Sequence, residues 1–292
     1  MSGRNRSRSL TSLRDDAPMM GPGDLLALYD AQLRTEAETA AALRVERIGP
    51  LHLATFAGGR GHITYRDLDR ADAAQIATWV AEAVEYYRAD PQVVAVEWKT
   101  RAHDRSPGLH EALTAAGFVP EEPESIMLGE ATGLTNAPPV PAVTIRRVSQ
   151  ESDIRAMAEM QDEGFGSTTS AVMVPEIVDR IAGGDPVQFW VAEASGEIVS
   201  AGRLQPVEGS DFAGIWGGAT RPSWRRRGIY RALTAARAHA AIDLGKTLIH
   251  SDSTPASRPV LERSGLTCVS STTPYRLQRC RQRHPETTRN DS

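Results

Sequence analysis

Apolar residues in the first half of the chain recur at the spacings of buried helix faces and strands. Ile76, Val80, Val84 and Tyr87 stand three or four residues apart, which predicts the buried face of one helix. The other elements expected in this half are a helix at 24–43, strands at 44–56 and 62–68 around a glycine-rich turn at 58–61, a short strand at 93–98, a helix ending at Gly117 and a strand pair within 118–128.

The second half shows the same alternation with clearer turn signals. Ser195 and Gly196 separate two apolar runs, which predicts a hairpin. The expected elements are a strand at 143–148, a helix at 154–160, hairpin strands at 189–194 and 198–206, strands at 212–220 and 249–253, and helices ending at Gly245 and Gly265. Antiparallel strands followed by strands separated by helices predict an α/β protein with a mixed sheet.

The two halves share a faint similarity. Residues 110–128 and 258–277 both predict a helix, a glycine stop, a strand, a turn and a strand, and a leucine precedes each glycine by four residues. This pattern fits a diverged duplication. It also fits coincidence, because many helices end on glycine.

Proline marks the boundary between the halves. Pro138, Pro139 and Pro141 remove backbone donors and fix φ, which predicts a semi-rigid linker. The predicted divisions are a disordered tail at 1–22, a first domain at 23–131, the linker at 132–142, a second domain at 143–279 and a disordered tail at 280–292.

Composition narrows the class of protein. The chain has 292 residues, 40% of them hydrophobic, so each half can bury a core. A net charge of −4 argues against general binding to nucleic acid, and no apolar run is long enough to cross a bilayer, so neither nucleic acid nor membrane is an expected partner. Two cysteines, Cys268 and Cys280, are too few for a disulfide framework or zinc cluster, so no metal is expected. A cytoplasmic location is expected by default.

The segment after the strand at 212–220 carries the strongest chemical signal. Arg225, Arg226 and Arg227 precede Gly228 at the start of a predicted helix. The first helical amides lack intrahelical acceptors, glycine allows close approach of the backbone, and guanidinium groups add charge-assisted hydrogen bonds. This arrangement predicts a phosphate site. The alternative is a solvated basic helix start.

This run resembles the Arg/Gln-x-x-Gly-x-Gly/Ala signature of the GNAT superfamily of N-acetyltransferases. Pro222 before it, and the segment 257–266 with its glycine stop, extend the resemblance over residues 143–277. The resemblance implies a GNAT fold that binds acetyl-coenzyme A as cosubstrate, with the pyrophosphate on the loop and the pantetheine arm along the strand end. It also implies a splay between the strands ending near 220 and 253, where a backbone N–H polarises the thioester carbonyl. The implied cofactor-binding residues are Gly218, Ala219, Thr220, Arg225, Arg226, Arg227, Gly228, Ile229 and Tyr230.

Three positions depart from the family pattern. Tyr230 replaces a glycine or alanine, Leu261 replaces a tyrosine that protonates the leaving thiolate, and Gly214 replaces a glutamate base found in some members. No catalytic residue is therefore assigned. Nearby titratable candidates are Asp211, His250, Asp252 and Tyr275.

The first half lacks a phosphate loop and resembles the degenerate partner domain of tandem GNAT proteins. We expect it to pack against the second domain and shape the acceptor site, with Glu97, Trp98, Asp104 and Glu121 as candidate lining residues. The expected function is acetylation of an amine on a small molecule or a protein. The alternatives are a catalytically silent acyl-coenzyme A-binding regulatory module and transfer of a longer acyl group. The sequence leaves acceptor and oligomeric state open.

Overall fold

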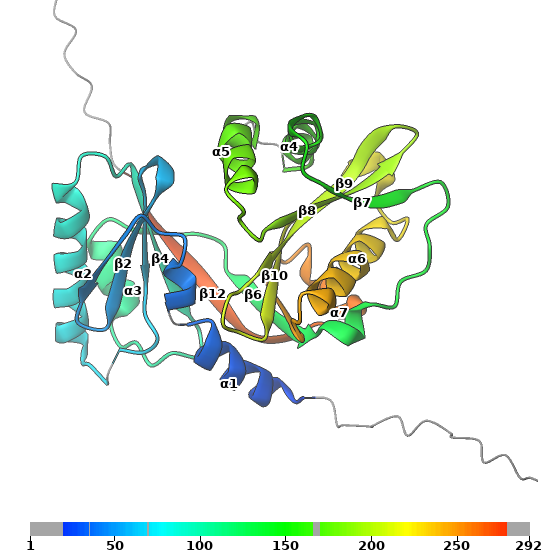
Figure 1. Ribbon diagram of the computed structural model, residues 1–292. Helices are drawn as coiled ribbons and strands as arrows, with labels where there is room; N and C mark the ends of the chain where they lie inside the picture. Colours follow the sequence, from blue (N-terminus) through cyan, green and yellow to red (C-terminus); the bar gives the residue numbers. More distant parts are fainter. Residues whose placement is uncertain (1–19, 35, 69, 166–169, 279–292) are drawn as a thin grey trace, which may run out of the picture.

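One continuous twelve-stranded sheet runs through both halves of the molecule (Figure 1). The structure is a computed structural model, and it describes residues 20–34, 36–68, 70–165 and 170–278. The strand order is β1-β2-β3-β4-β12-β6-β11-β10-β9-β8-β7, with β5 paired to β12 outside this path. The expected α/β fold with a mixed sheet is confirmed.

The first half contains six strands and three α-helices within the described residues. The strands are β1 (Arg44–Ile48), β2 (Leu51–Phe56), β3 (Arg60–Thr64), β4 (Ala95–Arg101), β5 (Val119–Pro120) and β6 (Glu124–Glu130). The helices are α1 (Pro22–Gln32), α2 (Ala73–Ala89) and α3 (Leu109–Ala115), with 3-10 turns η1 (Glu36–Thr39), η2 (Ala57–Gly59) and η3 (Ala131–Leu134). The predicted face of α2 is buried.

The second half follows the same alternation of strand and helix. Its strands are β7 (Thr144–Val148), β8 (Gln188–Ala194), β9 (Glu197–Pro206), β10 (Phe212–Thr220), β11 (Leu248–Ser253) and β12 (Thr267–Gln278). Its helices are α4 (Glu151–Phe165), α5 (Ser170–Ala182), α6 (Ile229–Asp243) and α7 (Arg258–Ser264), with the 3-10 turn η4 (Pro222–Trp224). The predicted strand at 212–220 coincides with β10.

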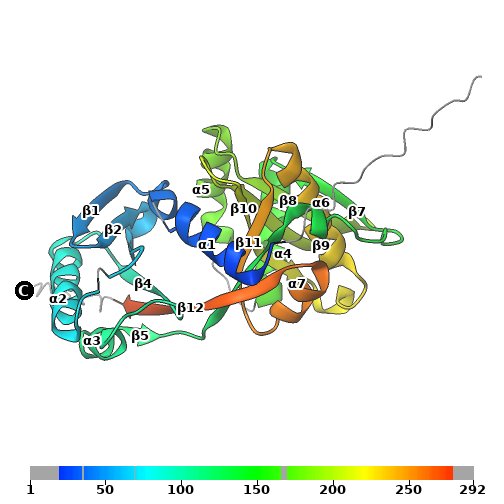
Figure 2. The same cartoon turned by 90° about the horizontal axis from the view of Figure 1, so that it is seen from below.

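The halves exchange strands where they meet. β6 belongs to the first half in sequence, yet it pairs with β11 and with the first part of β12. The second part of β12 then pairs with β4 of the first half. Figure 2 shows β12 running from one half to the other. Each half therefore completes its sheet with a strand from the other.

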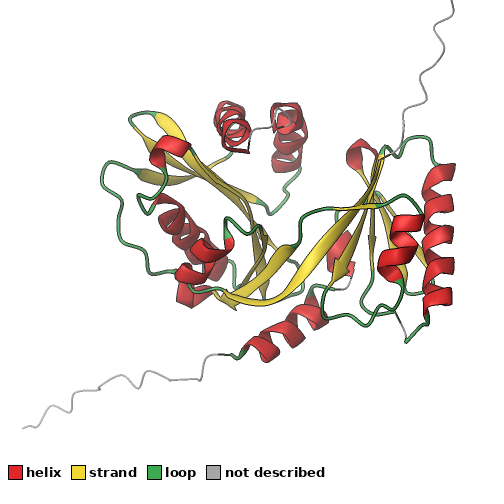
Figure 3. Ribbon diagram, turned by 180° about the vertical axis from the view of Figure 1, so that it is seen from behind, coloured by secondary structure: helices red, strands yellow, loops and turns green. Residues whose placement is uncertain are grey.

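Helices cover both faces of the second half. α6 packs over Leu204 and Ile215 on one face, whereas α4 and α5 pack over Val191 and Ala201 on the other. Figure 3 shows these two helix layers from behind. On the face opposite α6, α1 covers the central strands through an apolar cluster that includes Tyr29, so it lies over the junction of the halves.

Several predicted elements differ from the structure. The helix expected at 24–43 ends at Gln32, and the strand expected at 44–56 is two strands that reverse at Gly49, whose φ is 54°. Helix α5 was not predicted; it contains Pro175, a residue typical of helix breaks. Strands β5 and β6 do not pair with each other, because each pairs with β12 instead.

The predicted domain boundaries remain predictions. Residues 1–19 and 279–292, which include most of the expected tails and Cys280, lie outside the described residues. The predicted linker starts within η3, where Ala131 and Leu134 are buried in the core under α6. Farther along it, Arg231 of α6 donates a hydrogen bond to the carbonyl of Asn136 at 3.0 Å.

Candidate active site

The loop before α6 has the backbone conformation expected of an anion site. Gly228 caps the helix with a φ of 80°, in the left-handed region that glycine tolerates. Arg226 also has a positive φ, at 61°. The first amides of α6 lack intrahelical acceptors, and the side chains of Arg225, Arg226 and Arg227 are exposed around them. The helix start therefore presents N–H groups and three cations to the same solvent region.

Contacts with neighbouring residues hold this loop against the end of β10. Arg225 Nε donates a hydrogen bond to the carbonyl of Thr220 at 3.1 Å. The guanidinium of Arg227 lies 4.6 Å from the centroid of the Trp224 ring, within cation–π range. The two segments predicted to bind one cofactor, the strand end and the loop, are thus joined directly.

Strands β10 and β11 separate partway along their length. Their parallel pairing covers only three residue pairs and ends at Gly214 and His250. Ser251 Oγ then donates to the carbonyl of Ile215 at 2.9 Å, and beyond this β10 bulges away from its register with β9. Gly217 in the bulge has a φ of 61°. The structure has a splay where the sequence predicts one.

A cleft of about 590 Å³ occupies this splay, and residues from both faces of the sheet line it. Ile215 lines it from the face under α6. Trp216 and its β9 partner Arg203 line it from the opposite face, because neighbouring residues in a strand alternate.

The predicted cofactor residues outside the arginine run differ in their surroundings. Gly218 and Tyr230 line the cleft. Ala219 and Ile229 are buried. The hydroxyl of Thr220 lies 2.8 Å from Ser200 Oγ. Their role in cofactor binding stays a prediction.

Tyr230 turns toward the strand. A Cβ at Gly218 would lie 2.5 Å from Tyr230 Cε2, so the ring rests directly on that glycine. Behind the ring, the buried guanidinium of Arg237 lies 6.0 Å from its centroid and donates to the carbonyl of Arg203 at 3.3 Å. Burial lowers the pKa of Arg237. The aromatic ring therefore narrows the cleft on the α6 side.

The other two departures from the family pattern also have structural explanations. A Cβ at Gly214 would lie 2.3 Å from Trp216 Nε1 and 2.9 Å from His250 Nε2, so the space for a glutamate is already filled. Leu261 is buried under α6 and lines the cleft without a polar atom. Neither position supplies an acid or base.

Two of the four titratable candidates, His250 and Asp252, line the cleft. Asp211 instead accepts a hydrogen bond from Gln32 Nε2 at 2.7 Å, and the Tyr275 hydroxyl lies 2.8 Å from His110 Nδ1 within the first half. Neither of these two residues lines the cleft.

His250 is a neutral imidazole at physiological pH. Burial lowers its pKa to about 4, despite the opposing effect of Asp252. Its ring meets those of Phe212 and Trp216 edge-on, with centroids 5.8 and 5.1 Å away. Nε2 is buried without a hydrogen-bond partner among the described residues.

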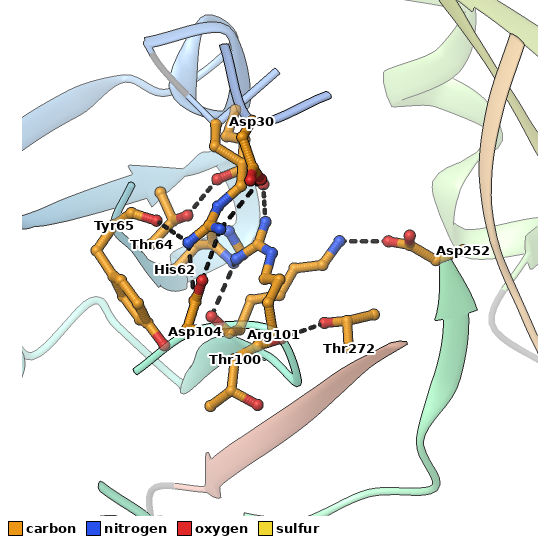
Figure 4. A network of polar contacts seen from close by, with 12 residues as sticks. Asp30, His62, Thr64, Tyr65, Thr100, Arg101, Asp104, Asp252 and Thr272 are labelled. Carbon is orange, nitrogen blue, oxygen red and sulfur yellow. Dashed lines mark hydrogen bonds and ion pairs between the residues drawn. The ribbon is translucent and has the colours of Figure 1, made fainter. Parts of the chain in front are cut away.

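A network of charged residues from the first half reaches Asp252 of β11 (Figure 4). Lys99 Nζ donates to Asp252 Oδ2, and Arg101 donates to Glu38 Oε1. Burial opposes the charge on Lys99, but Asp252 outweighs it and the pKa of Lys99 is raised. Burial likewise opposes the Glu38 charge, and Arg101 outweighs it, so the pKa of Glu38 is lowered. The side chains of both ion pairs are therefore ionised at neutral pH.

The four lining residues expected in the first half mostly serve other roles. Trp98 is buried in the core of that half, and Asp104 is paired with Arg34 at 2.7 Å. Glu97 lines an adjoining hollow, and Glu121 pairs with an arginine of β12 at 2.7 Å. None of the four lines the cleft itself.

Sequence reasoning missed Glu124 and Arg203, which both line the cleft. Glu124 is half-buried, and its pKa is raised by burial and by the charge of Asp252. No sequence motif marks either residue, because they come from β6 and β9 and meet the site only through strand pairing.

In the described part of the chain, no three or more histidine, cysteine, aspartate or glutamate side chains are arranged so that they could hold a metal ion, and no helix is both long and apolar enough to span a membrane.

Comparison with solved structures shows where this architecture recurs. A GCN5-related N-acetyltransferase from Kribbella flavida has a TM-score of 0.61 at 16% identity, with 82% of this chain and 93% of that chain covered. A tandem GNAT protein from the clavulanic acid biosynthesis pathway has a TM-score of 0.59 at 11% identity, with 89% of this chain and 97% of that chain covered. A protein of unknown function from Staphylococcus epidermidis has a TM-score of 0.64 at 12% identity, with 84% of this chain and 98% of that chain covered. These similarities establish the GNAT fold.

The sequence comparison places the family on the second half. Residues 154–266 match the model of the acetyltransferase (GNAT) family. No curated protein matches the chain. Residues 154–266 therefore match the GNAT family that the signature predicted, and the fold of the chain is shared with a tandem GNAT protein.

Proposed function

We propose that the protein transfers the acetyl group of acetyl-coenzyme A to an amine acceptor, on a small molecule or a protein. The observation that carries this proposal is the separation of β10 from β11 beyond Gly214 and His250, next to the Gly228-capped helix start. The loop amides and arginines bind the pyrophosphate. The backbone of 218–220 pairs with the pantetheine arm, and the thioester enters the cleft.

The reaction is a direct transfer. The neutral amine nitrogen attacks the thioester carbonyl carbon, the new C–N bond forms and the C–S bond breaks. The proton lost by nitrogen reaches the leaving thiolate through solvent, which gives an amide and free coenzyme A. Backbone N–H groups released from pairing at the β10 bulge polarise the carbonyl oxygen. Alignment of the two reactants supplies much of the acceleration.

The alternative is an acyl-coenzyme A-binding regulatory module without turnover. It is favoured by the apolar Leu261 and by the Trp216 indole at Gly214, since both sites lack an acid or base. Turnover separates the two functions.

The test begins with calorimetric titration of the full chain by acetyl-coenzyme A, desulfo-coenzyme A and ATP. We expect saturable binding of both coenzyme A compounds and none of ATP. A panel of amines is then incubated with acetyl-coenzyme A, and release of the thiol is followed. Binding with turnover supports the enzyme, binding without turnover supports the regulatory module, and absence of binding in folded protein refutes both.

A further inference from the structure

We propose that the acceptor is an amine that also carries an anionic group, and that Arg203 binds this anion while Glu124 binds the ammonium form of the amine, which releases a proton to solvent before the neutral nitrogen attacks. The inference rests on the acetyl transfer proposed above and adds the chemical class of its acceptor.

Most of the charged side chains that line the cleft are in ion pairs. Five formally charged side chains do so: Glu38, Lys99, Glu124, Arg203 and Asp252. Lys99 and Asp252 neutralise each other, and Glu38 is paired with an arginine of β4. Across residues 20–278, apart from the undescribed positions, neither Glu124 nor Arg203 has an ion pair or a side-chain hydrogen bond. The cleft therefore keeps one unpaired charge of each sign.

Arg203 has the surroundings of an anion subsite. It is exposed to the cleft on the face opposite α6, beside Trp216. The protein around the Arg203 guanidinium partly removes it from water, which is the main reason that its pKa is lowered. The like charges of Arg180 and Arg60 lower this pKa further. Gln205, two residues along β9 and on the same face, lines the cleft with it. A bound carboxylate or phosphate would relieve this repulsion and accept charge-assisted hydrogen bonds.

Glu124 has the complementary surroundings. It lies two residues before Ile126, the β6 partner of Asp252, so both acids lie on one face of the sheet. Lys99 already neutralises Asp252. Glu124 thus remains the carboxylate that gains most from an incoming ammonium group. An acceptor with both charges satisfies both residues, whereas a simple amine leaves Arg203 unpaired.

The test compares pairs of amines of similar size, of which only one member carries an anion, with each rate referred to the concentration of neutral amine. Glycine is paired with glycinamide, and phosphoethanolamine with ethanolamine, which separates carboxylate from phosphate recognition. We expect at least one anionic member to have a kcat/KM roughly 10-fold or more above its neutral partner. Arg203→Met should abolish that preference. Arg276→Met is the matched control, because Arg276 lines the adjoining hollow and is already paired with Glu97 and Glu121. Equal use of both members, or a preference that survives in Arg203→Met, overturns the proposal.

A binding measurement keeps the proposal testable without turnover. The same four amines and inorganic phosphate are titrated into the full chain saturated with desulfo-coenzyme A, which occupies the phosphate loop. We expect saturable binding of an anionic probe, weakened roughly 10-fold or more by Arg203→Met. Glu124→Gln should weaken an amine-bearing probe similarly but leave inorganic phosphate unchanged. Absence of saturable anion binding refutes the subsite, whereas failure of desulfo-coenzyme A to bind refutes the proposed function instead. In that case phosphate is titrated alone, and only binding lost in Arg203→Met and kept in Arg225→Ala supports the subsite.

Discussion

Lys99 on β4 donates a hydrogen bond to Asp252 on β11, and this pair joins the two halves at the edge of the cleft. Only 19% of the Lys99 side chain and 7% of the Asp252 side chain are exposed. The first half therefore supplies a side chain to the lining of the cleft.

Loss of this pair should destabilise the protein. Lys99→Met leaves the Asp252 carboxylate buried and unpaired, which is expected to lower the free energy of unfolding by about 3 kcal/mol. Urea denaturation measures the change. The double variant Lys99→Met, Asp252→Asn is the control and should recover most of the loss, because the buried charge is gone. A loss below about 1 kcal/mol in the single variant would mean that the pair is effectively solvated.

Cofactor binding should depend on the loop before α6. Gly228→Glu places a carboxylate beside the proposed pyrophosphate site and strains a residue with a φ of 80°, so we expect roughly 100-fold weaker binding of acetyl-coenzyme A. Arg225→Ala should weaken binding by roughly 10-fold. Calorimetry measures both. Gly228→Ala isolates the backbone strain, and Arg231→Ala tests an arginine whose guanidinium bonds Asn136 instead. Unchanged affinity in both test variants would remove the loop from the cofactor site.

The Tyr230 ring should restrict the acyl chain. It rests on Gly218 within the cleft, so Tyr230→Ala is expected to raise kcat/KM for butyryl-coenzyme A relative to acetyl-coenzyme A by roughly 10-fold. Tyr230→Phe keeps the ring and should keep the wild-type preference. If both variants gain butyryl transfer equally, the hydroxyl rather than the ring volume sets the preference, and if neither does, Tyr230 does not restrict the acyl chain.

The second half should need β6. The domain boundaries predicted from the sequence imply that residues 143–279 fold and bind the cofactor alone, but β6 lies between β11 and β12. Without it, the facing edges of both strands have unpaired N–H and C=O groups. We expect the 143–279 fragment to aggregate or remain unfolded by circular dichroism. Coexpression with residues 20–142 should restore a soluble complex. A monomeric, folded fragment that binds acetyl-coenzyme A would show that the strand exchange is dispensable.

The stability of the protein should decrease as the pH is lowered, over a pH range set by His250. Its pKa is about 4 in the folded protein and near 6.5 when unfolded, so the unfolded chain binds the proton first as the pH falls. The stabilisation is complete above pH 6.5 and is lost progressively toward pH 4, at a total of about 3 kcal/mol. Denaturation at pH 7 and pH 4 measures it. Asp252, Lys99 and Glu38 also act on this ring, so the comparison is with His250→Phe, which should lose about 3 kcal/mol less between the two pH values. Equal losses would contradict a buried neutral imidazole.

Elements with strong local signals could be predicted from the sequence. The periodic face of α2, the hairpin at Ser195 and Gly196 and the strand β10 are confirmed, because periodicity and turn residues act over a few neighbours. The helix expected to reach residue 43 was wrong, since alanine-rich composition alone does not say where tertiary contacts end a helix.

The sequence by itself determined the match of residues 154–266 to the GNAT family and the choice of a candidate phosphate loop, because the signature consists of consecutive residues around Gly228. Only the tertiary structure decided which residues line the cleft. The pairing of β6 with β11 and of β12 with β4 brings Glu124 and Lys99 to the splay, and these contacts join segments more than a hundred residues apart. Local spacing carries no record of such pairings, because strand register is set by packing across the whole sheet.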